Sequence, residues 1–173
     1  MVAPILETIT KMKDFEELEV LEANIRRNSR HLPDVEEALR AKYAHLGRAL
    51  VASRTGLDLD NLGPVEERIV EAVAKYVGLQ KREGKTANRT FQMLANHGLI
   101  ESAEISVSKA KPTQGFEVLE DADLKALSFE QIIVDFPNEF SPRALWFARK
   151  TLGLPNDNEK PPASETLITQ IRT

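Results

Sequence analysis

The sequence predicts a mainly α protein, a helical domain of about six helices that carries one small β-hairpin. Two observations lead to this prediction. Apolar residues recur at three- and four-residue steps through most of the chain, which is the period of amphipathic helices. Between residues 103 and 109 the period changes to strict alternation of apolar and polar residues, which is typical of a half-buried strand.

The composition excludes several classes of protein. Of the 173 residues, 42% are hydrophobic and 29% are charged, which argues against a disordered or collagen-like chain. No apolar run approaches the roughly 20 residues of a membrane span, so we expect no membrane partner. Because the chain has no cysteine, it has neither disulfides nor Cys-ligated metals. We also see no secretory signal in residues 1–12, and we expect a cytoplasmic protein without cofactor or metal.

Residues 1–30 are expected to form an N-terminal helical extension. Their apolar spacing predicts a helix over 5–28, and the pattern is compatible with a break near Thr10 or Lys13. We expect this helix to support a homodimer. The apolar residues on which the prediction depends are Ile5, Ile9, Met12, Leu18, Leu21 and Ile25.

Residues 31–155 are expected to form a single helical core domain. Its first helix follows Pro33 and stops at Gly56, and the next begins at Pro64, a residue suited to the first helical position. Gly78 and Gly84 are taken to weaken the end of that second helix.

The second half of this domain is expected to hold the hairpin and two further helices. The hairpin covers 103–119, although 116–119 also suit the start of a helix. Ser128 and Ser141 are predicted N-caps, because a serine hydroxyl accepts a hydrogen bond from the first turn of a helix. The polar, proline-rich residues 156–173 are expected to form a flexible tail.

Charge is spread unevenly along the chain. Residues 75–111 carry a net charge of +4 and residues 112–140 a net charge of −6. Such a dipolar pattern is typical of polyanion binding or of head-to-tail self-association. Ordinary variation between solvated helix faces explains it equally well.

The predicted helix over 87–96, capped by Thr86, has the most informative surface. Its apolar side holds Ala87, Phe91, Leu94 and Ala95, and its other side holds Asn88, Arg89, Gln92 and Asn96. Arginine, asparagine and glutamine can each make two hydrogen bonds to one base edge. The basic side chains just before this helix are placed to neutralise phosphates; they are Lys81, Arg82 and Lys85.

From residue 64 to 119 the order of parts resembles a winged helix-turn-helix domain. A capped helix of Arg, Asn and Gln ends in the sequence 96–100, Asn-His-Gly-Leu-Ile, and leads into the predicted hairpin. The resemblance implies that Asn88, Arg89 and Gln92 face the major groove of double-stranded DNA. It also implies that Lys109 and Lys111, on the wing, face the adjacent backbone.

A second cluster places four of the ten aromatic residues between 136 and 147. Aromatic residues beside arginine are typical of interface anchors, which makes Trp146 and Phe147 candidate interface residues. They are equally typical of a corner of the core where two helices meet.

Two functions follow from these patterns. The first is a cytoplasmic DNA-binding or regulatory protein with a winged-helix-like module. The alternative is a small helical adaptor or self-assembling protein. In both, the chain is not an enzyme, although the sequence leaves open a carboxylate site assembled by folding.

Overall fold

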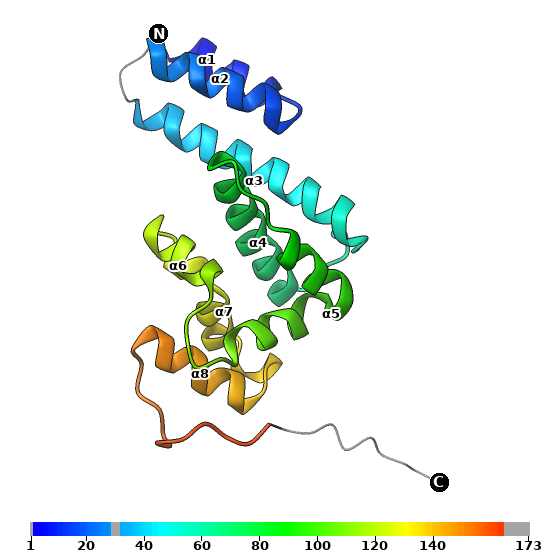
Figure 1. The fold of residues 1–173 in the computed structure, drawn as a ribbon, viewed down its shortest axis with the longest axis vertical. Coiled ribbons are helices and arrows are strands. Elements are labelled where there is room, and N and C mark those ends of the chain that lie inside the picture. Colours follow the sequence, from blue (N-terminus) through cyan, green and yellow to red (C-terminus); the bar gives the residue numbers. More distant parts are fainter. Residues whose placement is uncertain (1, 29–31, 165–173) are drawn as a thin grey trace. The chain divides into compact units, whose positions relative to one another are not determined.

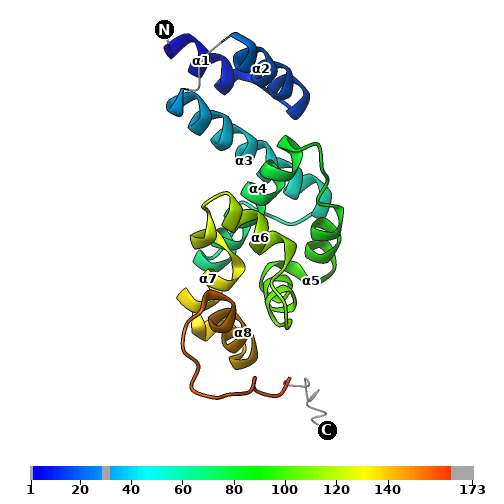
Figure 2. The same ribbon diagram turned by 60° about the vertical axis from the view of Figure 1, so that its left-hand side comes forward.

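The structure, a computed structural model, describes residues 2–28 and 32–164. Every regular element in these ranges is a helix, as Figures 1 and 2 show. No helix in the same ranges is long and apolar enough to cross a membrane. The elements are α1 (Ala3–Lys11), α2 (Phe15–Asn28), α3 (Pro33–Thr55), α4 (Pro64–Arg82), α5 (Asn88–Val107), α6 (Gln114–Asp121), η1 (Lys125–Leu127), α7 (Phe129–Asp135), η2 (Pro137–Glu139) and α8 (Pro142–Leu152).

The chain divides into two compact units, Met1–Gly98 and Leu99–Thr173. The first unit contains α1 to α4 and the first half of α5, and the second contains the remaining helices. Gly98 interrupts α5 with a φ of 73° and a ψ of −172°, a backbone conformation that glycine adopts readily. The boundaries predicted from the sequence, at residues 30 and 155, remain predictions.

In the first unit, α1 and α2 form a helical hairpin beside α3 (Figure 1). The single helix predicted over 5–28 is two helices, because α1 ends at Lys11 and α2 begins at Phe15, between which lies Lys13, one of the two positions where the pattern was compatible with a break. The apolar residues expected to support a dimer pack within the chain instead, and the homodimer itself stays a prediction. The buried cluster comprises Ile9, Leu18, Val35, Leu39, Tyr43 and Leu46.

Helices α3 and α4 cross with their backbones in close contact. A Cβ atom added to Gly47 would lie 2.4 Å from the carbonyl oxygen of Ala74, and one added to Gly78 would lie 2.9 Å from that of Tyr43. The prediction that Gly78 weakens the end of its helix is therefore wrong. Gly78 lies inside α4 and is buried, because only a residue without a side chain fits this crossing.

We expect Gly47→Ala to destabilise the first unit by about 2 kcal/mol, because the new methyl group meets backbone that cannot rotate away. Gly115→Ala is the matched control. Its new Cβ would meet only the Thr113 hydroxyl at 3.7 Å, so the better helix propensity of alanine should stabilise α6 by up to about 1 kcal/mol. Urea unfolding of both variants measures the two changes. Equal effects of the same sign would contradict the close crossing.

The predicted hairpin over 103–119 is wrong. Its first half belongs to α5, whose buried positions recur at steps of three and four residues and include two serines. The small serine side chains are buried together with apolar ones on one side of the helix. Because these serines are polar, the sequence alternates between apolar and polar residues as a strand would. The buried residues of this half are Leu99, Ser102, Ala103, Ser106 and Val107.

The second half of the predicted hairpin forms helix α6. The Thr113 hydroxyl accepts a hydrogen bond from the Phe116 backbone N–H and caps the helix. The alternative left open for 116–119, a helix start, is therefore the correct one. Both halves of the predicted hairpin are therefore helical, and the described residues contain no sheet. The two-stranded wing that the winged-helix resemblance implied is not formed.

Helices α7 and α8 pack together in the second unit (Figure 2). Both predicted serine caps are confirmed, because the hydroxyls of Ser128 and Ser141 accept hydrogen bonds from the first turns of α7 and α8. The chain after α8 stays close to that helix, because hydrogen bonds to α8 hold residues 154–164 there. The other part of the predicted flexible tail, 165–173, lies outside the described residues.

Candidate functional site

Only part of the predicted DNA-binding set lies in one unit. The basic residues of 81–85 and the first half of α5 belong to the first unit. Lys109 and Lys111 follow the second half of α5 and belong to the second unit, on the segment that leads to α6. The wing that was to carry these two lysines is not formed.

The first half of α5 presents the predicted polar face. Asn88, Arg89, Gln92 and Asn96 are all exposed, and we call these four residues the α5 stripe. The opposite side of the helix is buried through Ala87, Phe91 and Leu94, as predicted, whereas Ala95 is exposed. The stripe offers three amides and one guanidinium, which together can donate to and accept from a partner's polar groups.

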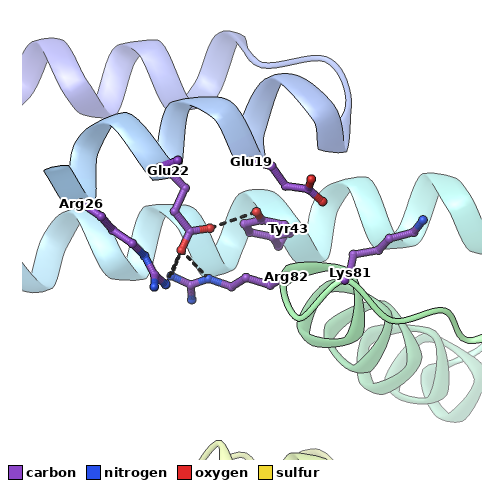
Figure 3. A pocket seen from close by; sticks show the side chains of 8 residues that line it. Glu19, Glu22, Arg26, Tyr43, Lys81 and Arg82 are labelled. Atoms are coloured by element: carbon purple, nitrogen blue, oxygen red, sulfur yellow. Dashed lines mark hydrogen bonds and ion pairs between the residues drawn. The ribbon is translucent and has the colours of Figure 1, made fainter.

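Arg82 lies at the centre of an ion-pair network that joins α2, α3 and α4 (Figure 3). Its guanidinium donates two hydrogen bonds to Glu22 Oε1, from Nε at 2.9 Å and from Nη2 at 2.7 Å. The two terminal nitrogens also reach the carboxylate of Glu36, at 2.6 and 2.8 Å. With its donors used in this way, Arg82 serves the fold and does not face a phosphate.

Further contacts complete this network around Glu22. The Tyr43 hydroxyl donates to Glu22 Oε2 at 2.9 Å, and Arg26 donates to Oε1 at 2.5 Å. The Arg82 guanidinium carbon lies 5.7 Å from the centre of the Tyr43 ring. Glu22 is buried, so a charge-assisted network of this kind is needed to keep its carboxylate ionised.

The pKa values follow from these contacts. Hydrogen bonding to Arg82 lowers the pKa of Glu36 to about 2 although partial burial opposes the shift. Burial raises the pKa of Glu22, but the hydrogen bonds and charge of Arg82 outweigh it and lower the value below that of a free glutamate. Burial, assisted by the Glu22 carboxylate, raises the pKa of Tyr43.

The other predicted phosphate contacts are also engaged within the chain. Lys85 pairs with Glu83 at 2.6 Å on the surface. The ammonium group of Lys81 lies 5.6 Å from the centre of the Phe15 ring, within reach of a cation–π interaction. Arg89 is exposed and makes no ion pair with the described residues. Among the predicted basic contacts of the first unit, Arg89 is therefore the one left to meet a partner.

A pocket of about 280 Å³ lies beside the network, between α2 and the end of α4 (Figure 3). Its floor consists of groups that already bind one another, above all Glu22, Tyr43 and Arg82. Glu19 and Lys81 line it as well. The polar groups of Glu22, Tyr43 and Arg82 in this lining are therefore already engaged with one another. The described residues contain no group of three histidines or carboxylates that could hold a metal ion.

The two predicted interface residues lie on α8 and differ in exposure. Phe147 is buried, with 7% of its surface accessible, and belongs to the core of the second unit. Trp146 is half-buried and meets Phe147 edge to face at 5.1 Å between ring centres. Of these two residues, only Trp146 is therefore accessible to a partner, and its interface role stays a prediction.

The residues that sequence reasoning missed are Glu22, Glu36 and Tyr43. One signal for the network was present in α2. Glu22 lies four residues after Leu18 and three before Ile25, on the apolar side of the helix. A carboxylate at such a position indicates a buried ion pair, although nothing in the sequence says which cation it meets.

No protein-family model matches this chain, and the searches of curated proteins and of solved structures find no match either.

Proposed function

We propose that this chain is a cytoplasmic, non-enzymatic helical protein-interaction module whose contact surface is the α5 stripe. The single observation that carries the proposal is the exposure of four polar side chains along one face of a helix whose other face is buried. A helix fixed in this way presents its side chains in a constant order, which suits recognition of a macromolecule.

The distribution of charge favours a protein partner over DNA. Binding to DNA derives most of its strength from several lysine and arginine contacts to phosphates. Within the described part of the first unit, Arg82 is enclosed by two carboxylates, Lys85 pairs with Glu83, and Lys81 lies over the Phe15 ring, which leaves Arg89 as the exposed basic residue of the α5 stripe. Protein interfaces, in contrast, combine few charges at their centre with amide and arginine hydrogen bonds.

The ion-pair network supports this function indirectly. It fastens the end of α4 to α2 and α3, and the backbone N–H of Lys85 in the turn after α4 donates to the Gln80 carbonyl at 2.8 Å. These contacts fix the beginning of the turn that connects α4 to α5. We infer that Arg82 positions the stripe, whereas Arg89 contacts the partner.

Site-specific photo-crosslinking tests the proposal. A photoreactive amino acid replaces Gln92 on the stripe or, as the matched control, the exposed Ala49 on α3. Each full-length variant is irradiated in an extract of its source cells, and the adducts are separated into protein and nucleic acid. We expect a discrete protein adduct at position 92 that is absent at position 49.

Two results would overturn the proposal. A nucleic-acid adduct at position 92 that disappears as salt rises from about 50 to 200 mM would assign the stripe to DNA or RNA. Equal yields at positions 92 and 49 would show that the stripe is an ordinary solvated face.

A further inference from the structure

The segment after α8, residues 154–164, folds back onto that helix, and we call it the strap. The indole Nε1 of Trp146 donates to the carbonyl of Asn158 at 2.9 Å. Arg143 donates to the carbonyl of Pro162 at 2.7 Å, and the Asn156 side chain donates to the Trp146 carbonyl at 3.0 Å. Two side chains of α8 therefore hold the strap by its backbone.

The chemistry of this contact is that of peptide recognition. Both donors of α8 bind backbone carbonyls of the strap. These hydrogen bonds depend on the course of the peptide backbone and not on the side chains of the strap. Pro161 and Pro162 are half-buried, whereas 157–160 are exposed. An indole N–H bound to a peptide carbonyl near prolines is a common arrangement in grooves that bind proline-containing peptides.

Charge adds a second criterion. Helix α8 carries Arg143, Arg149 and Lys150 and no acidic residue, and the ammonium group of Lys150 lies 5.3 Å from the centre of the Trp146 ring. The strap contributes the carboxylates of Asp157 and Glu159 and the ammonium group of Lys160, a net charge of −1. The helix therefore has a charge of +3 and an aromatic face, and the strap that it holds has a net charge of −1 and contains three prolines.

We propose that the Arg143–Trp146 face of α8 is a binding surface for a short acidic, proline-containing peptide segment of a partner protein, and that the strap occupies it as an internal substitute. A peptide of this chemistry binds only when the strap is displaced. The strap therefore lowers the apparent affinity of this surface for the partner's peptide. The surface belongs to the second unit and is independent of the α5 stripe.

The test uses the full-length chain and the fluorescence of Trp146, the single tryptophan. The probe is an acetylated synthetic peptide with the sequence of residues 154–164. A strap variant combines Asn156→Ala, Pro161→Gly and Pro162→Gly. We expect its emission to shift to longer wavelength and the peptide to reverse that shift saturably. The peptide should bind the variant about tenfold more tightly than the wild type, whose surface is mostly occupied.

Two controls sharpen the result. A peptide with Asp157→Asn and Glu159→Gln should bind about threefold more weakly at low salt, because it lacks the carboxylates. Adding Arg143→Met to the strap variant removes the side-chain donor to the Pro162 carbonyl and should weaken binding of the original peptide about fivefold. If the triple variant loses helical circular dichroism, Asn156→Ala alone replaces it, with a smaller shift in the same direction.

Failure of the peptide to change the emission at about 5 mM, a concentration comparable to that of a tethered segment, would overturn the proposal. Equal affinity for wild type and strap variant would overturn it too, because the strap would then not cover the surface. Neither outcome depends on the crosslinking experiment at position 92.

Discussion

Arg82→Ala is expected to lower the free energy of unfolding of the first unit by about 3 kcal/mol, because it removes the central cation of the ion-pair network. The variant leaves two carboxylates without their main cation, and the Glu22 side chain is only 8% exposed. Its charge then has to be stabilised by Tyr43 and the exposed Arg26 alone. Urea unfolding followed by far-UV circular dichroism measures the loss.

Arg40→Ala is the matched control for this prediction. Arg40 pairs with the same Glu36 carboxylate at 3.2 Å, but its side chain is 53% exposed. An exposed pair of this kind contributes less than about 1 kcal/mol. Arg82→Lys should give an intermediate loss, since an ammonium group cannot make paired hydrogen bonds to both carboxylates. A loss from Arg82→Ala no larger than that from Arg40→Ala would contradict the network.

The pH dependence of the same variants gives an independent readout. The folded-state pKa of Glu36 is about 2, against 4.5 for a free glutamate, and that of Glu22 is lowered too. Groups with lowered pKa values stabilise the fold above pH 4.5, and this stabilisation disappears as pH falls from 4.5 towards 2. The acid-induced loss should therefore be shallower in Arg82→Ala than in the wild type.

Glu130→Gln is expected to stabilise the second unit by about 3 kcal/mol at pH 8. Glu130 is the second residue of α7 and is 2% exposed. Burial raises the pKa of its carboxyl to about 7, and hydrogen bonds with its own backbone N–H and with Ser128 only partly oppose this shift. A raised pKa means that the folded state prefers the protonated acid. The wild type should lose stability as pH rises from 4.5 through 7, and the uncharged amide avoids this loss.

Unfolding by urea between pH 4 and 8, followed by the fluorescence of Trp146 in the same unit, measures this difference. Wild type and Glu130→Gln should converge near pH 4, diverge as pH rises from 4.5 to 7, and keep a nearly constant difference above pH 7. Glu117→Gln, at an exposed position on α6, is the control and should stay within about 0.5 kcal/mol of the wild type throughout. Parallel pH profiles of Glu130→Gln and the wild type would contradict the raised pKa.

Most helix boundaries of this fold could be predicted because their signals are local. Pro64, Ser128 and Ser141 start helices, and Gly56 and Gly153 end them with positive φ angles of 70° and 72°. Each depends only on the residue and its immediate neighbours.

The errors arose where packing decides the outcome. Ser102 and Ser106 are buried in a helix face, so the residues around them alternate in polarity without forming a strand. Gly78 is a helix breaker by propensity, yet the close approach of α3 requires it inside α4. Neither fact can be read from the local sequence, because each depends on a partner helix distant in the chain.

The candidate site was half predictable for the same reason. The exposed side of α5 followed from helical spacing, which correctly placed Asn88, Arg89 and Gln92 away from the core. The ion pairs of Arg82 could not be predicted from the sequence, because its carboxylate partners lie 60 and 46 residues earlier in the chain. Arg82 and Arg89 are only seven residues apart, yet Arg82 is enclosed by carboxylates and Arg89 is exposed. The structure is needed to tell them apart.

The most direct test of the proposed function compares the protein adduct at position 92 between the wild-type background and Arg89→Ala. Arg89 is exposed, so its loss should change the free energy of unfolding by less than about 0.5 kcal/mol. We predict that the adduct yield falls at least severalfold while stability is unchanged. An undiminished yield in Arg89→Ala would contradict the assignment of the α5 stripe as the contact surface.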